Sequence, residues 1–289
     1  MVSTDFINEC KNRANKNRLG QLIVDGNDTP ITQSDKLQNF TIDSGCYVDG
    51  NIIGSIYIKK ITGNILDSNN LNLLDKIIYA EIGVKYTDNS TEYIEMGKYT
   101  VERPKDEQTA NLSQITGYND LNNKLENNYV CGIDYSLSNV TLSDLYIDVC
   151  NQLGLTPVTT TFDNSTITIE SNPFTNNEKN RTVLQAIAKI AGTWVEIDDE
   201  TNQISLNWLS QNEEPDYIFY KNDYATLEGG KIVCGPINCL IIKNSSIDDE
   251  NVTIKDEESI ALNGENSIVI NEDYILYNAQ LRQQAINSI

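Results

Sequence analysis

Residues 52–63 read IIGSIYIKKITG, and the alternation in this stretch decides the fold of the first half of the chain. Ile56 and Ile58 alternate with Tyr57 and Lys59, which is the two-residue period of a strand with one buried face. Five other segments between residues 21 and 118 share this composition and end near turn-forming residues. They are QLIVDG (21–26), KLQNFTID (36–43), IIYAEIGVKYTD (77–88), TEYIEMGKYTVER (91–103) and SQITGYND (113–120). Six such segments predict a closed or sandwiched antiparallel β domain, with Asp88 and Asn89 in a hairpin turn.

A short helix is predicted ahead of these strands, over residues 3–18. Ser3 or Thr4 can cap its N-terminus, and Phe6 and Cys10 recur on one face at a spacing of four residues. We expect a glycine two residues later to end it. A single amphipathic helix before a β domain packs on that domain or on a neighbouring subunit, so Phe6 and Cys10 are candidates for docking on a partner.

The pattern changes to mixed α/β near residue 119. Leu142, Leu145, Val149 and Leu153 have helical spacing, and Gly154 marks the end of that helix. The segments that we expect to be regular are a helix over 141–154, a strand over 166–170 (TITIE), a helix over 180–192, and a hairpin that joins TWVEID to QISLNWL through DDETN.

An acidic joint with a proline, QNEEPDY (211–217), leads to the last part of the chain. Further strands are expected in KIVCGPINCLIIKNSS (231–246), VTIKDEES (252–259) and ENSIVINEDYIL (265–276), and residues 279–288 can form another helix.

The formal net charge of −21 comes from 42 acidic and 21 basic residues. Residues 192–275 hold 18 acids and 4 bases, a net of −14. Proteins bind nucleic acid by placing Lys and Arg against phosphates, so this balance argues against a DNA-binding surface. It is compatible with an ordinary solvated surface, and also with a wall that repels polyanions. The sequence has no apolar run of about 18 residues that could span a membrane, and no secretory signal follows the basic N-terminus.

Most catalytic chemistry is missing from the residue inventory, because the chain has no histidine. This removes Ser/His/Asp and Cys/His nucleophile systems and most zinc hydrolase sites. No phosphate-binding glycine loop is present. The six cysteines lack CxxC spacing, and we interpret them as reduced, mostly buried thiols. They are Cys10, Cys46, Cys131, Cys150, Cys234 and Cys239. We therefore expect no catalytic residue, no metal site and no cofactor.

Two alternatives to a structural role stay open. A hydrolase could use paired acids, but Asp198-Asp199, Glu213-Glu214 and Asp248-Asp249-Glu250 fall in predicted turns and joints. A carbohydrate-binding adhesin would need Trp194 or Trp208 exposed in a groove, whereas tryptophans beside a hairpin usually fill core or interface space.

Several segments together resemble bacteriophage tail hub proteins. MGKYTVERP (96–104) followed by ITGYND (115–120) is similar to a strand pair of that family, although Asn119 stands where an aspartate is expected. VLQAIA (183–188) with GTWV (192–195) resembles the helix and hairpin of the family's inserted α/β domain. GPIN (235–238), ENV (250–252), IKDEESI (254–260) and NG (263–264) resemble a later segment. The similarity covers most of residues 20–280, in the expected order.

The resemblance implies a mixed β and α+β fold, in which tube-type antiparallel β-barrel domains carry an inserted small α/β domain. The corresponding domains are an N-terminal amphipathic helix (1–20), a tube-type β domain (21–118), the inserted α/β domain (119–212), and an acidic joint with return strands that begin a second tube-type domain (213–289). It further implies a non-enzymatic hub in the virion tail, assembled in the bacterial cytoplasm. Three copies would form a ring that continues the tail tube.

The same resemblance implies several partners. They are other copies of this chain in a homotrimer, the distal tail protein ring, the tape-measure protein, and tip or fibre proteins. DNA would pass through the ring without being specifically bound. If the chain lines that channel, acids in loops beside tube strands should face the lumen, and the candidates are Glu228, Asp248, Asp249 and Glu250.

Overall fold

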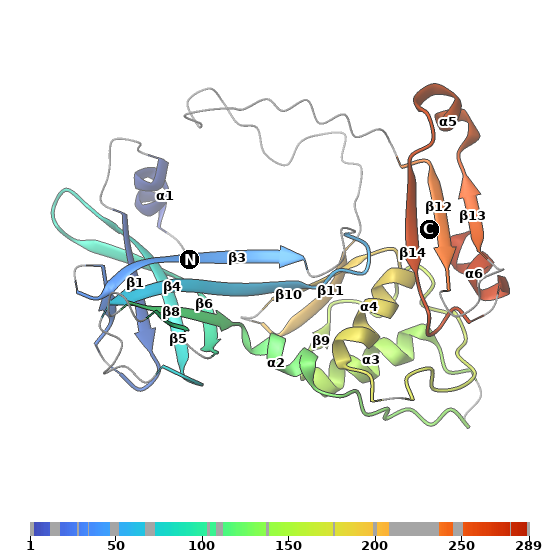
Figure 1. The fold of residues 1–289 in the computed structure, drawn as a ribbon, viewed down its shortest axis with the longest axis horizontal. Helices are drawn as coiled ribbons and strands as arrows, with labels where there is room; N and C mark the ends of the chain where they lie inside the picture. Colours follow the sequence, from blue (N-terminus) through green and yellow to red (C-terminus); the bar gives the residue numbers. More distant parts are fainter. Residues whose placement is uncertain are drawn as a thin grey trace. The chain divides into compact units, whose positions relative to one another are not determined.

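The computed structural model describes most of the chain, in fourteen continuous segments. They are residues 3–11, 18–27, 29–33, 35–46, 52–66, 73–102 with 105–107, 112–136, 139–175, 177–198 with 201–207, 237–244, and 251–277 with 279–287. The chain forms two compact units (Figure 1). Unit 1 comprises Met1–Gly45 and Ile58–Lys124, and unit 2 comprises Cys46–Tyr57 and Leu125–Ile289. The four-part division drawn from the sequence stays a prediction.

Unit 1 is built on one eight-stranded antiparallel sheet. Its order is β2-β1-β5-β6-β8-β4-β3, and β7 pairs with β8. The strands are β1 (Arg18–Val24), β2 (Ile31–Thr32), β3 (Leu37–Cys46), β4 (Tyr57–Leu66), β5 (Ile77–Lys85), β6 (Thr91–Val101), β7 (Lys105–Glu107) and β8 (Leu112–Tyr118). Each of the six segments with period-two patterning therefore contributes a strand. The turn between β5 and β6 is also as predicted, since Asn89 takes a left-handed φ of 70° there.

The alternating apolar residues of these strands meet in one core. Leu22, Ile61, Ile78 and Ile115 are all fully buried in it, together with the ring of Tyr99. Hydrogen bonding does not close the sheet along its described strand path, because β2 and β3 remain its two ends. The mixed β and α+β class is thus confirmed, whereas no closed barrel is formed by the residues described.

Side-chain packing brings β1, which lies next to one end of the sheet, against β3 at the other end, although the two strands share no ladder. A Cβ added at Gly20 on β1 would lie 2.7 Å from Cε1 of Phe40 on β3, so the ring packs directly on the glycine. Only a residue without a side chain leaves room for this contact. The sheet is therefore strongly curved, with its apolar face inside.

Gly117 on β8 allows a similarly close approach, and it provides a first prediction. A Cβ there would lie 3.0 Å from Ile61 Cγ2 and 3.1 Å from the backbone oxygen of Thr100. We expect Gly117→Ala to lower the free energy of unfolding by about 1–3 kcal/mol through overpacking. Gly45→Ala is the matched control, because no atom lies within 4 Å of its added Cβ. Equal urea midpoints for both variants would contradict the tight packing.

Helix α1 (Thr4–Lys11) precedes the sheet and packs against β5. The helix predicted over residues 3–18 is wrong at its end, because Arg18–Gly20 already belongs to β1. Gly20 pairs with Ile82 in the sheet and lies under Phe40, so tertiary packing outweighs its character as a helix stop. Residues 12–17 lie outside the described part. Helix α2 (Asp120–Glu126) follows β8.

Unit 2 contains the predicted helices and hairpin. Helix α3 (Leu142–Leu153) begins with a capping box between Thr141 and Asp144 and ends at Gly154, whose φ is 67°. Helix α4 (Asn180–Ile190) packs against α3, and both bury their apolar faces. A three-stranded sheet, in the order β10-β11-β9, consists of β9 (Thr156–Pro157), β10 (Trp194–Asp198) and β11 (Gln203–Asn207).

The strand predicted at TITIE is wrong, although the segment is extended. Thr168 forms only an isolated bridge with Thr141. Ile167 and Ile169 are buried while their neighbours face solvent, which produces a strand-like alternation without a ladder. The segment instead pairs briefly with the residues that lead into α3, through Leu142 N to Ile167 O and Ile169 N to Val140 O.

The last part of unit 2 is a three-stranded sheet, which we name the C-terminal arm together with its helix α5. It consists of β12 (Cys239–Lys243), β13 (Val252–Lys255), α5 (Glu257–Asn263) and β14 (Ser267–Asn271), followed by α6 (Ala279–Ile286). The predicted helix near the C-terminus is confirmed by α6. The strand expected through VTIKDEES ends at Lys255, because the Asp256 side chain accepts from Ser259 N and starts α5.

Candidate functional site

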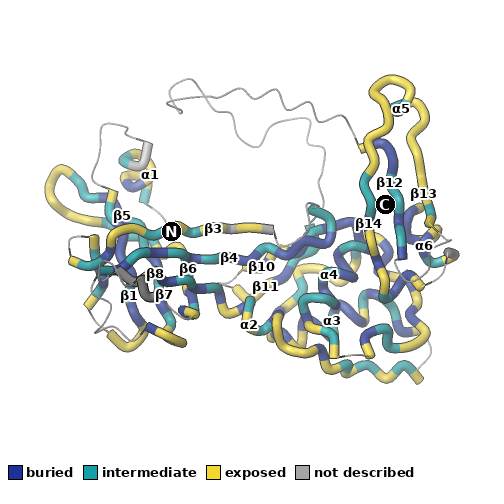
Figure 2. The backbone as a smooth tube through the Cα atoms, in the orientation of Figure 1, coloured by how far each residue is buried: buried dark blue, intermediate teal, exposed yellow. Residues whose placement is uncertain are grey.

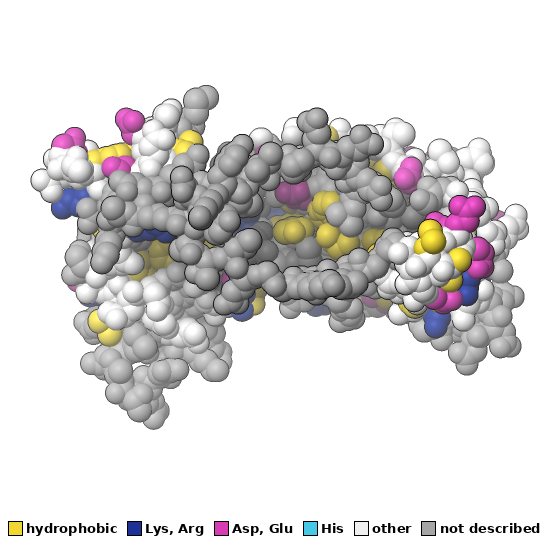
Figure 3. Space-filling view, turned by 90° about the horizontal axis from the view of Figure 1, so that it is seen from above, with side chains coloured by type: hydrophobic (Ala, Val, Ile, Leu, Met, Phe, Trp, Pro, Cys, Tyr) yellow, Lys and Arg dark blue, Asp and Glu magenta, His cyan; other side chains and the backbone are white. Residues whose placement is uncertain are grey.

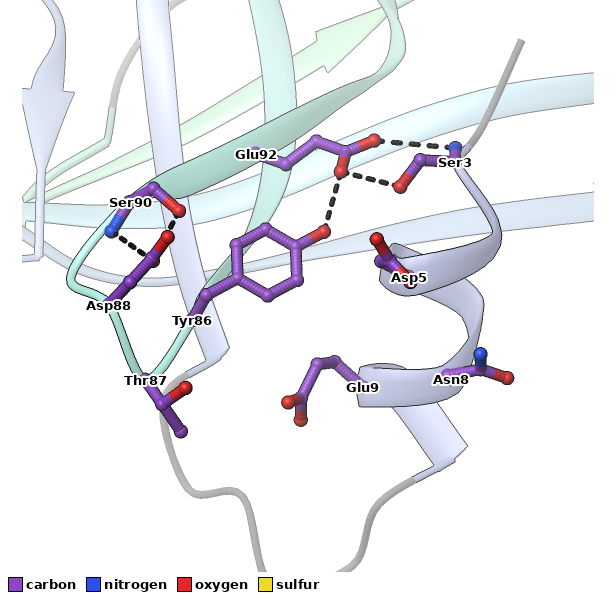
Figure 4. A pocket seen from close by; sticks show the side chains of 9 residues that line it. All are labelled: Ser3, Asp5, Asn8, Glu9, Tyr86, Thr87, Asp88, Ser90 and Glu92. Atoms are coloured by element: carbon purple, nitrogen blue, oxygen red, sulfur yellow. Dashed lines mark hydrogen bonds between the residues drawn. The ribbon is translucent and has the colours of Figure 1, made fainter.

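The best-defined polar site of unit 1 joins α1 to the β5–β6 hairpin. Ser3 caps α1 by accepting from Phe6 N at 3.0 Å. Its hydroxyl also donates to Glu92 Oε2 at 2.6 Å, and Tyr86 donates to the same oxygen at 2.5 Å. Ser3 N donates to Glu92 Oε1 at 3.3 Å. We name Ser3, Tyr86 and Glu92 the N-terminal clasp; Figure 4 shows both donors converging on the carboxylate.

These contacts perturb both titratable groups of the clasp. The hydroxyls of Ser3 and Tyr86 stabilise the ionised carboxylate and lower the pKa of Glu92. The Glu92 carboxylate in turn raises the pKa of Tyr86, because it favours the protonated phenol. The clasp is therefore an ionised acceptor held by two neutral donors.

A pocket of about 590 Å³ lies beside the clasp, between α1 and the hairpin (Figure 4). Asp5, Glu9, Asp88 and Glu92 line it, and no basic side chain is among the described lining residues. Hydrogen bonds from Ser90 lower the pKa of Asp88. Hydrogen bonds from Ser3 and Tyr86 lower the pKa of Glu92 in the same way. Hydrolysis by two acids requires one carboxyl group with a raised pKa as proton donor. The shifts of Asp88 and Glu92 run the opposite way, so these two side chains are poorly suited to that role.

The clasp makes the attachment of α1 dependent on pH. Since the pKa of Glu92 is lower in the folded chain, the clasp stabilises α1 above the ordinary carboxyl pKa. This stabilisation is lost as the pH falls through the lowered value. We expect the hydrogen-exchange protection of α1, measured relative to β6 in the same sample, to fall on acidification. In Glu92→Gln this ratio should already be low at neutral pH and should not respond to acid; an unchanged ratio would argue against the clasp.

The residues predicted as sites have different fates. Phe6 is 4% exposed and packs within its own chain, whereas Ile7 on the same helix is 44% exposed. Glu228, Asp248, Asp249 and Glu250 lie outside the described residues, as do Trp208 and the side chain of Cys10. Trp194 is half-buried on β10. The channel-lining and docking roles stay predictions.

A second polar site, which we name the arm joint, lies where β14 leads into α6. Glu272 is 2% exposed and accepts from three successive backbone N–H groups. Oε1 accepts from Tyr274 N at 3.0 Å and Ile275 N at 3.1 Å, and Oε2 from Ile275 N at 3.0 Å and Leu276 N at 2.6 Å. Burial raises the pKa of Glu272, and these donors oppose that shift.

Two cations hold the backbone on either side of Glu272. The fully buried Arg282 donates from Nη1 to Leu276 O at 2.8 Å, and Lys189 donates from Nζ to Asn271 O at 3.0 Å. Asn164 links α6 to α4 by donating to Ala285 O at 3.1 Å and to Ile190 O at 2.8 Å. The arm joint is therefore a structural lock, and no periodic signal in the sequence pointed to it.

Asp148 and Cys150 of unit 2 both have structural surroundings. Asp148 accepts from Tyr129 Oη at 2.6 Å and from Gly132 N at 3.1 Å, which fixes the loop before α3. Burial raises the pKa of Cys150 to about 12, so that thiol is not a nucleophile near neutral pH. Within the described residues, no three Cys, Asp or Glu side chains converge on a possible metal position.

No protein-family model matches this sequence. No curated protein matches it either. Two solved structures share its fold, however. The 43 kDa tail protein of prophage MuSo2 from Shewanella oneidensis is similar with a TM-score of 0.51 and 12% identity, over 92% of this chain and 76% of that one. The tail protein from Neisseria meningitidis MC58 has a TM-score of 0.50 and 10% identity, over 93% and 74%.

This chain has a tail-protein fold. The likeness extends over both units, because more than nine-tenths of the chain is covered in each comparison. The resemblance seen in the sequence motifs is thereby confirmed at the level of the fold. None of the described helices is long and apolar enough to cross a membrane.

Proposed function

We propose that this chain is a structural subunit of a phage-type tail, in which three copies form a hub ring that continues the tail tube. The shared fold with two tail proteins carries the proposal. The polar sites of the chain support it, because the clasp and the arm joint fix helices to sheets and offer no reactive group. The half-buried Trp194 gives no specific support to a carbohydrate-binding role, and Trp208 lies outside the described residues.

The ring would contact other tail components, namely the distal tail protein, the tape-measure protein and tip or fibre proteins. DNA would pass through its channel without specific binding. Negative charge on the channel wall repels the DNA phosphates and keeps the DNA from binding to the wall. Salt screens this repulsion beyond about 8–10 Å, so only acids on the wall itself contribute. Glu228, Asp248, Asp249 and Glu250 are the proposed wall acids.

The location is tested by labelling the chain in assembled particles. A peptide tag on the chain, detected by gold-conjugated antibody in electron micrographs, is expected at the distal end of the tail. Quantitative mass spectrometry should give three copies per particle. A label along the whole tail, on the capsid, or only in the unassembled fraction would refute the hub proposal.

The wall acids are tested separately by neutralisation. Replacing all four by their amides removes four negative charges without changing side-chain size. We expect particles to assemble normally and to eject DNA more slowly, with the difference shrinking at high salt. Asp163→Asn/Glu170→Gln, at two exposed acids of unit 2, is a charge control outside the proposed wall. If the altered particles ejected DNA at the same rate as unaltered particles, these acids would not line the channel.

A further inference from the structure

One face of the C-terminal arm is apolar over two adjacent rows of side chains. Register places Val252, Ile242 and Ile270 side by side in the inner row. Ile254, Leu240 and Ile268 form the outer row on the same face, since positions two residues apart along a strand share a face. Helix α6 packs against β12 and β13, and Ile242 and Ile270 are buried.

No described residue covers the outer row completely. Ile254 is 44% exposed and Leu240 and Ile268 are half-buried, while Leu262 on the adjoining helix α5 is 84% exposed. Figure 2 shows α5 and the outer end of the arm as exposed. In the right-hand part of Figure 3, hydrophobic and acidic side chains lie beside one another there. A contiguous apolar surface with a charged rim is typical of an interaction site.

The rim of this surface is acidic. Asp256, Glu257 and Glu258 follow β13 directly, and Glu257 and Glu258 are exposed in the first turn of α5. The partner should therefore present basic side chains around an apolar or aromatic centre.

Unit 1 carries a surface of this kind on the outer face of its sheet. Register places Tyr118 between Lys60 and Thr100, Thr100 beside Ile77, and Lys98 beside Tyr79. The ammonium group of Lys60 lies 5.9 Å from the centre of the Tyr118 ring. These six residues are half-buried or exposed, and Lys60 and Lys98 are the charged members of the set. We name them the lysine–tyrosine face.

The net charges of the two units favour contact between unit 1 of one copy and unit 2 of another copy. Unit 1 has 16 acids and 13 bases, a net of −3, whereas unit 2 has 26 acids and 8 bases, a net of −18. Two copies that met through unit 2 would bring strongly negative surfaces together. Contact from unit 2 of one copy to unit 1 of the next brings much less like charge together. A repeated unlike contact forms a ring when the rotation between copies closes.

We propose that the outer row of the C-terminal arm docks on the lysine–tyrosine face of a second copy of this chain. The apolar row covers the tyrosine rings and Ile77, and the acids of α5 approach Lys60 and Lys98. The proposal rests on the ring proposed above and names the two surfaces that meet in it.

Site-specific photocrosslinking tests the contact. A photoreactive phenylalanine at Ile254 is introduced into the full-length chain, which is mixed at high concentration with an isotope-labelled copy. We expect crosslinks from the arm to peptides of β4, β5, β6 or β8 that carry the other label. Crosslinks to another surface, crosslinks only within one copy, or none at all would overturn the proposal.

Charge exchange tests the same contact in a second way. Glu257→Lys/Glu258→Lys and Lys60→Glu/Lys98→Glu are each expected to weaken association about tenfold, since exposed charge pairs contribute modestly. Mixing the two variants should restore most of the lost affinity, because unlike charges then meet again. Ile254→Asp should also weaken association, whereas Val130→Asp, at another exposed apolar residue of unit 2, should not.

Two outcomes separate the alternatives. If Lys60→Glu/Lys98→Glu reduced binding to duplex DNA and left self-association unchanged, the lysine–tyrosine face would belong to nucleic acid and the proposal would fall. If the tagged chain lay at the distal tail end but the crosslinks led elsewhere, the docking surfaces would be wrong and the hub role would stand. Circular dichroism of each variant confirms that it is folded.

Discussion

Glu272→Ala is expected to lower the free energy of unfolding of unit 2 by about 3–5 kcal/mol. The carboxylate is the acceptor for three successive N–H groups in a buried turn. Alanine leaves these donors without a partner and opens a cavity beneath them.

Tryptophan fluorescence measures this effect selectively, because both tryptophans of the chain, Trp194 and Trp208, belong to unit 2. We expect the urea midpoint of the fluorescence transition to fall strongly in Glu272→Ala. The midpoint of Glu272→Gln should fall by an intermediate amount, since the amide side chain retains one oxygen acceptor. Glu170→Ala, at an exposed carboxylate, should change stability by less than about 0.5 kcal/mol. If Glu272→Ala had the same urea midpoint as the control variant Glu170→Ala, the arm joint would not stabilise unit 2.

Tyr99→Ala is expected to lower the free energy of unfolding of unit 1 by about 3–5 kcal/mol. Its ring is fully buried at the centre of the curved sheet, beside Gly117 and Ile115. Its hydroxyl donates to Met96 O at 3.1 Å. Truncation therefore removes a large apolar contact area and leaves a cavity that strands on both sides cannot fill.

The matched variant for this residue is Tyr99→Phe, which keeps the ring and loses only the hydrogen bond, at a cost of about 1 kcal/mol. Unfolding of unit 1 can be followed by hydrogen exchange of β1 and β5 amides. The tryptophan transition of unit 2 should stay within about 0.5 kcal/mol of its original position. A large shift of that transition would show that the two units unfold as one.

Local patterns predicted those elements whose partners lie nearby in sequence. Helix α3 carries its own start and stop signals in Thr141, Asp144 and Gly154, so its bounds follow closely from the sequence. Helix α5 carries comparable signals, Asp256 followed by two glutamates and Gly264, but the β-branched residues before it favoured a strand. That error reflects a competition between two local signals.

The polar sites could not be predicted in the same way, because their partners are distant or irregular. The clasp joins Ser3 to Glu92, which are 89 positions apart. At the arm joint, Glu272 stands in an apolar stretch where no period marks it as buried, and its acceptor role depends on the turn that follows. Gly20 has the signature of a helix stop, and only the approach of Phe40 explains why it lies in a strand.

The pairing of β1 with β5 has a consequence for biosynthesis. Leu22 lies opposite Ala80, and Ile61 on β4 lies opposite Gly117, so the first strands find their neighbours only after long stretches of chain have been made. Ribosomes add about 5–20 residues per second, so the edge of β1 that pairs with β5 waits for several seconds without its partner strand. High contact order then slows the pairing itself. Nascent chains of this protein should therefore be most prone to aggregate before β8 emerges, and slower growth at low temperature should increase the yield of folded subunits.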